Sequence, residues 1–135
     1  MPFRFGVVTL TAAPQAFLRA RIRLDDGREA EGAAAELLAP KWFDKNPALT
    51  NEDNFEQLRA SLRAARERYL ANGGRSAWAH SYSAVGLVEN FGPALLDRAL
   101  LDALCRALGI SVYQAIRNNI VGAGVFEGMD LEKFF

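Results

Sequence analysis

The chain has 135 residues, of which half are hydrophobic and 24% are charged, the balance of an ordinary globular domain. Sixteen basic side chains against sixteen acidic ones leave no formal net charge, which disfavours a general nucleic-acid or membrane-surface binder. One cysteine and one histidine exclude an internal disulfide and a zinc site built from these residue types, and fit a cytoplasmic protein.

The first third of the chain has the alternation of β-strands. Residues 3–10 carry apolar side chains on both faces of a predicted strand. From Leu18 to Leu24, apolar residues alternate with Arg19, Arg21 and Arg23, which is typical of a half-buried antiparallel strand. The Asp-Asp-Gly-Arg sequence at 25–28 then predicts a tight turn.

The return strand is predicted over residues 29–36. Its inward-facing side chains are only Ala30, Gly32 and Ala34, and such small residues indicate that something large packs close over them. A loop at residues 37–50 follows, with two prolines and the sequence Lys-Trp-Phe-Asp-Lys in its middle.

Helical spacing begins after Thr50, which can cap a helix that runs to Asn72-Gly73-Gly74. A second helix is predicted around residues 78–88, a third from Gly92-Pro93 to Gly109, and a short fourth after Ser111. The order of strands followed by three to four helices predicts an α+β fold with a three-stranded antiparallel meander.

The residues that most often carry chemistry form no recognisable site. Neither Ser81 nor Ser83, near the single His80, lies in a nucleophile motif, and we interpret His80 as structural or solvent-facing. Cys105 is predicted to be a buried, inert thiol. The arginine stripe of the second strand is interpreted as a solvated face, because Asp and Glu residues surround it. No metal ligands and no catalytic residues are predicted in this chain.

The loop around residues 41–45 is the most informative segment outside the helices. Trp42 and Phe43 stand between charged residues, an arrangement that suits contact with a ligand or partner. The alternative is that both rings cover the open end of the core, and the sequence leaves these two interpretations equally open.

Three segments, taken in order, resemble the N-terminal capping domain of the enolase superfamily, especially the mandelate racemase and muconate lactonizing branch. They are the Phe-Arg-Phe-Gly opening at 3–6 with the strand that follows, the Asp-Gly hairpin at 26–27 with Glu31-Gly32, and residues 94–103 with 109–113. The chain departs from the family pattern at Leu101, where a tryptophan is usual, and at Cys105-Arg106.

The resemblance implies a covering domain at residues 1–122, followed by a tail or the start of an absent barrel domain at 123–135. In this family a separate barrel holds Mg²⁺ and the acid/base groups, and the covering domain lends two loops that select a small carboxylate substrate. By position, the candidate substrate contacts here are Thr11 and Gln15 in the first loop, and Lys41, Trp42, Phe43, Asp44 and Lys45 in the second.

The function expected from this resemblance is that of a substrate-capping domain of a lyase or isomerase of the dehydratase, racemase or cycloisomerase type, without turnover of its own. Its expected partners are a barrel domain, on the same or another chain, and further copies of itself; no nucleic acid or membrane is expected. The alternative is an independent α+β module that binds a small ligand or another protein through the aromatic loop or the arginine stripe.

Overall fold

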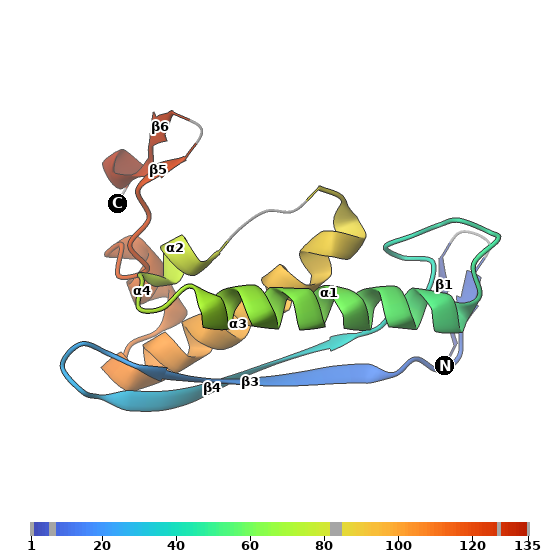
Figure 1. The fold of residues 1–135 in the computed structure, drawn as a ribbon, viewed down its shortest axis with the longest axis horizontal. Helices are drawn as coiled ribbons and strands as arrows, with labels where there is room; N and C mark the ends of the chain where they lie inside the picture. The colour runs from blue at the N-terminus through green and yellow to red at the C-terminus, as the bar shows by residue number, and fades with distance from the viewer. Residues whose placement is uncertain (1, 6–7, 82–84, 127, 135) are drawn as a thin grey trace.

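A computed structural model describes residues 2–5, 8–81, 85–126 and 128–134, and its fold is α+β (Figure 1). A long β-hairpin is covered on one side by two long helices, and short elements complete each end. The strands are β1 (Phe3–Phe5), β2 (Val8–Leu10), β3 (Gln15–Arg23), β4 (Glu29–Leu37), β5 (Val125–Phe126) and β6 (Met129–Asp130). The helices are α1 (Asn51–Ala71), α2 (Ala77–His80), α3 (Leu87–Leu108), α4 (Val112–Arg117) and a final 3-10 turn, η1 (Leu131–Phe134).

The hairpin of β3 and β4 confirms the predicted alternation. The two strands are antiparallel and in register from Gln15 opposite Leu37 to Arg23 opposite Glu29. The arginines of β3 lie on the exposed face, where Arg21 forms an ion pair with Glu31 at 2.7 Å. Gly27, with φ +86°, closes the predicted turn in a conformation that favours glycine. The arginine stripe is therefore largely neutralised by carboxylates of the neighbouring strand.

The predicted first strand differs from the structure. Residues 3–10 form two short strands, β1 and β2, which pair with each other, with Phe3 opposite Leu10, and residues 6 and 7 lie outside the described part. The described strands of the main sheet are only β3 and β4, so the structure holds an antiparallel pair where a three-stranded meander was predicted. Pairing β1 with β2 closes a shorter loop than pairing either strand with β3 would, which lowers the entropy cost of loop closure. The segment just before β3 is held elsewhere, because Leu38 N donates a hydrogen bond to the carbonyl of Pro14 at 2.9 Å.

Helix α3 packs directly against β4, and Gly32 makes this contact possible. A Cβ atom at Gly32 would lie 2.2 Å from Ala103 N and from Ala99 O, both backbone atoms of α3. Ala99 and Ala103 are fully buried at this contact. The sequence predicted that something large packs over the small inward-facing residues of β4, and the structure shows that this is the backbone of α3.

The outer edge of β4 is also closed by α3. The Asp102 carboxylate accepts a hydrogen bond from Ala33 N at 2.9 Å, and Arg98 pairs with Glu36 at 3.0 Å. The Ala33 N–H, followed by the Arg106 guanidinium, lowers the pKa of Asp102 below its ordinary value. A strand edge that could pair with another chain is thus covered by side chains of the same helix.

A second glycine brings α3 against α1. A Cβ atom at Gly92 would lie 2.3 Å from Ser61 O, so the two helix backbones nearly touch at this crossing. The buried Ser61 hydroxyl accepts from Gly92 N at 2.9 Å and donates to Glu89 O at 2.9 Å. The latter carbonyl lacks a helical donor because residue 93 is proline, which has no N–H.

This arrangement corrects the predicted helix boundaries. Gly92-Pro93 does not begin a helix: α3 begins six residues before Pro93, at Leu87, and continues through it. The second helix is only α2, Ala77–His80, with residues 82–84 outside the described part. The local sequence does not predict this continuation, because the hydroxyl of Ser61, on a distant helix, donates to the Glu89 carbonyl that Pro93 leaves without a helical donor.

The other helix ends agree with the sequence. Thr50 and Asp53 form a reciprocal capping box at the start of α1, and Ser111 with Gln114 forms another at the start of α4. Gly109 ends α3 in the left-handed conformation at φ +65°. These ends depend on contacts within four residues, so local sequence is enough to predict them.

We predict that Gly32→Ala strongly destabilises the fold, because the added methyl would overlap backbone atoms of α3 that cannot move aside as a side chain would. The free energy of unfolding, measured by urea denaturation, should fall by about 3 kcal/mol or more. The matched control is Gly74→Ala, where a Cβ atom meets nothing within 4 Å. Equal stability of the two variants would contradict the close packing of β4 on α3.

Candidate functional site

The two segments predicted to contact substrate lie side by side at the open end of the β3–β4 hairpin. Gln15 is the first residue of β3, not part of a loop, and it pairs with Leu37, the last residue of β4. The hydrogen bond from Leu38 N to Pro14 O joins the segment at 11–14 to the segment at 38–50. Thr11 and Gln15 are both exposed. The strand register thus brings together two segments that are separated in the chain by the whole hairpin.

The second segment is held in shape by its own charged residues. Lys41 has a left-handed backbone, with φ 62°, and its N–H donates to Asn54 Oδ1 at 3.0 Å. Its Nζ donates to the carbonyl of Asn46 at 2.8 Å and to that of Leu49. The ammonium group of Lys41 is therefore occupied within the loop and is not directed at a ligand.

Asp44 has a comparable role. Its carboxylate accepts hydrogen bonds from Gln57 Nε2 and from Asn46 N, each at 2.9 Å. These donors, first Gln57 and then Asn46, lower the pKa of Asp44 below its ordinary value. The group stays ionised at neutral pH and ties the loop to α1, which does not suit a general acid.

Trp42 and Phe43 have different environments, although the sequence left open whether both rings contact a ligand or partner or both cover the core. The ring of Phe43 packs edge-on against Phe91 at 5.1 Å between centroids and joins the core cluster of Leu38, Leu58 and Phe91. Trp42 is 53% exposed, and Lys45 is also exposed. Phe43 thus covers the end of the core, while the Trp42 side chain is more than half exposed.

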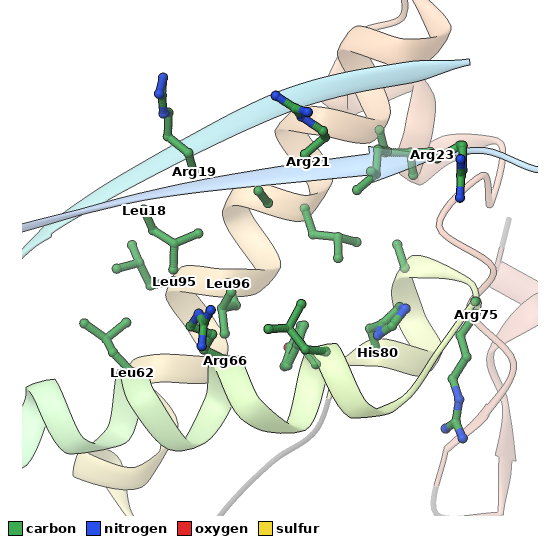
Figure 2. A pocket seen from close by; sticks show the side chains of 18 of the residues that line it. Leu18, Arg19, Arg21, Arg23, Leu62, Arg66, Arg75, His80, Leu95 and Leu96 are labelled. Atoms are coloured by element: carbon green, nitrogen blue, oxygen red, sulfur yellow. The ribbon is translucent and has the colours of Figure 1, made fainter. Parts of the chain in front are cut away.

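A cavity of about 690 Å³ lies between the inner face of β3 and the helices α1 and α3 (Figure 2). Its walls are formed mainly by aliphatic residues, among them Leu18, Ile22, Leu62, Leu96 and Leu100. The alternation of β3 identified its inner face as apolar. Sequence alone could not show that this face is only partly covered, because that depends on where α1 crosses α3.

One end of the cavity is polar and centres on His80. The imidazole stacks on Tyr69 at 5.8 Å between ring centroids, and its Nδ1 atom is buried without a hydrogen-bond partner in the described structure. Asp97 accepts hydrogen bonds from the Tyr69 hydroxyl and from Ser81 Oγ, the latter at 2.7 Å. Because Ser81 bonds to Asp97 and not to His80, these residues do not form the relay of a serine nucleophile.

Cys105 is buried, as expected, and burial raises the pKa of its thiol, with the Asp102 carboxylate adding to the shift. A thiol held protonated in this way is a poor nucleophile. This finding agrees with the prediction of an inert cysteine.

The described residues contain no group of three or more His, Cys, Asp or Glu side chains that could hold a metal ion. They therefore do not fit a Mg²⁺ site of the enolase type, and no step of chemistry is assigned to a metal on this chain. In the described part of the chain, no helix has the length and apolar character needed to cross a membrane.

Large apolar side chains are exposed near the C-terminal end of the fold. We call them the C-terminal apolar group, and they belong to α2, α4 and the segment after α4: Trp78, Val112, Tyr113, Ile116, Ile120, Val125, Phe126, Met129 and Phe134. Trp78 and Phe126 contact each other edge-on at 6.4 Å, and Trp78 N donates to Val121 O at 2.9 Å. Figure 1 shows these elements gathered at one end of the molecule, away from the segment at 38–50.

Comparison with known proteins supplies no relative. No family model, curated protein or solved structure matches this chain.

We predict that the two aromatic residues of the loop differ in their effect on stability. Phe43→Ala should lower the free energy of unfolding by about 2 kcal/mol, because it empties a contact in the core. Trp42→Ala should change it by less than about 0.5 kcal/mol, because the ring is more than half exposed. Urea denaturation of both variants measures this, and equal losses would show that Trp42 is also part of the core.

Proposed function

We propose that this chain is a covering domain of the enolase type. In this role it closes over a small carboxylate substrate held by a barrel domain, excludes water and selects the substrate. The acid/base groups and the Mg²⁺ of a dehydratase, racemase or cycloisomerase then belong to the barrel. The chain on its own would have no turnover.

The observation that carries this proposal is the C-terminal apolar group. Nine large apolar side chains on α2, α4 and the following segment are between 39% and 72% exposed. Surfaces of this kind are typical of docking sites, because exposed apolar area is reduced when a partner covers it. A covering domain needs such a surface where the chain leads toward its barrel.

The segments at 11–14 and 38–50, which we call the loop pair, lie at the open end of the hairpin and support the proposed role in substrate selection. The segments at 11–14 and 38–50 are joined by the Leu38–Pro14 hydrogen bond, and Trp42 projects from them. Lys41 and Asp44 fix the loop instead of contacting a ligand, so its shape is determined before a substrate arrives. Of the seven predicted contacts, we propose Trp42, Thr11, Gln15 and Lys45 as those that face the substrate.

The enolase-like arrangement also requires a third strand in the meander. The outer edge of β3 has no strand partner among the described residues, and this edge is the place where residues 3–10 would lie. We propose that these residues join β3 when the chain is bound to its barrel.

The C-terminal apolar group leads to a prediction about the isolated chain. We expect self-association that increases with concentration, measured by sedimentation velocity, because the apolar side chains cover each other when no barrel is present. The double variant Ile116→Lys/Val125→Lys should be monomeric over the same range. The control is Phe17→Lys, which removes an exposed apolar ring on the outer face of β3 and should associate like the parent chain.

The covering function itself is tested by mixing the chain with a barrel domain of the mandelate racemase branch from which its own cover has been deleted. We expect exchange of the proton next to the carboxylate for deuterium, followed by NMR, to increase when the chain is added. Trp42→Ala should reduce this gain, whereas Phe17→Ala should not. A chain that remains monomeric and does not bind the barrel would contradict the proposal.

A further inference from the structure

We infer that the cavity between β3, α1 and α3 is a binding site for a single-chain amphiphile with an anionic head, of which a medium-chain fatty acid is the simplest example. This site is separate from the loop pair and from the C-terminal apolar group, and the inference does not rest on the covering role.

The charge of the cavity walls is the first argument. Although the chain has no formal net charge, the described residues that line the cavity include six arginines and one histidine, and no aspartate or glutamate. Arg19 and Arg21 point away from the cavity in Figure 2 and pair with Glu31, so they contribute little to its interior. Arg63 is paired with Glu56. Arg23 lies 4.0 Å from Glu29, and Arg75 Nε donates to the carbonyl of Asn72 at 3.1 Å. The cation that remains for a ligand at the cavity is therefore Arg66.

Arg66 has no ion pair or hydrogen bond among the described residues, in contrast to Arg59 and Arg63 on the same helix. Figure 2 shows its guanidinium on the α1 side of the cavity, between Leu62 and His80. A guanidinium group can bind a carboxylate through two parallel hydrogen bonds. An anion at this position would supply the partner that the other arginines lining the cavity already have.

His80 provides a second, independent indication. Its Nδ1 atom is buried and has no partner in the described structure, and the residue lines the cavity. A buried polar atom without a hydrogen bond costs free energy, which a bound polar group would recover. Arg66 and His80 both line the cavity, and His80 lies nearer its polar end (Figure 2).

The aliphatic part of the cavity wall indicates the chemistry of the other end of the ligand. Figure 2 shows Leu18 of β3 with Leu62 of α1 and Leu95 and Leu96 of α3 around the space. Ile22 and Leu100 also line it. A volume of about 690 Å³ is within the usual range for small-molecule sites. An aliphatic chain fits this lining because it makes no demand for hydrogen bonds along the walls.

A second copy of the chain is a poor occupant for the open edge of β3. Two β3 strands paired across a two-fold axis would bring Arg19, Arg21 and Arg23 of one copy against the same residues of the other. Like charges directly opposite each other destabilise a strand pair. The arginine repeat of β3 therefore disfavours self-pairing at this edge.

The test is calorimetric titration with decanoate, 1-decanol and decyltrimethylammonium, each below its micelle concentration. We expect decanoate to bind most tightly, and affinity to rise about fourfold for each added methylene from octanoate to decanoate. Methyl resonances of Leu18, Ile22 and Leu100 should shift on binding. Equal affinity for the three head groups, no dependence on chain length, or shifts confined to the C-terminal apolar group would overturn the inference.

The head-group contact is tested with Arg66→Gln, which should weaken decanoate binding about tenfold and leave decanol binding unchanged. The matched control is Arg68→Gln, two residues along α1 and outside the cavity lining, which should bind decanoate like the parent chain. Circular dichroism establishes that both exposed-site variants are folded. Unchanged decanoate affinity in Arg66→Gln would refute Arg66 as the anion-binding group.

Discussion

The structure depends on the close approach of the α3 backbone to its two neighbours. At Gly32 the helix lies against a strand, and at Gly92 it lies against α1, with distances that leave no room for a Cβ atom in either place. Because packed interiors do not deform easily, these two contacts fix where the hairpin and α1 sit relative to α3. The hydroxyl of Ser61 then stabilises the crossing by bonding on both sides of it.

That geometry also creates the features that bear on function. Helix α3 contacts β4 more extensively than β3, and the inner face of β3 is left to border a cavity with α1. The same placement positions α2 and His80 at the end of this cavity. The open end of the hairpin lies elsewhere, where the Pro14–Leu38 contact and the anchored Phe43 support an exposed Trp42. Two possible contact regions thus share one framework without sharing residues.

The polar residues of the loop illustrate how a charged segment can serve structure. Lys41 and Asp44 are charged residues of the kind expected in a binding site. Their hydrogen bonds, however, join parts of the loop to each other and join the loop to α1. By contrast, Arg66 is one of many arginines in the sequence, and its lack of a partner beside the cavity distinguishes it. The environment of a charge, more than its type, separates residues that hold the fold from those available to a ligand.

The sequence by itself determined the α+β class, the β3–β4 hairpin with its charged outer face, the capped ends of α1 and α4, and the small residues that admit a helix. These features follow from side-chain alternation and from contacts within a few residues. Only the tertiary structure decided that α3 continues through Pro93, that residues 3–5 pair with residues 8–10, and that Phe43 packs on the core while Trp42 is exposed. The continuation of α3 and the burial of Phe43 depend on Ser61 and Phe91, which are distant in the chain, and no local pattern encodes which distant partner arrives.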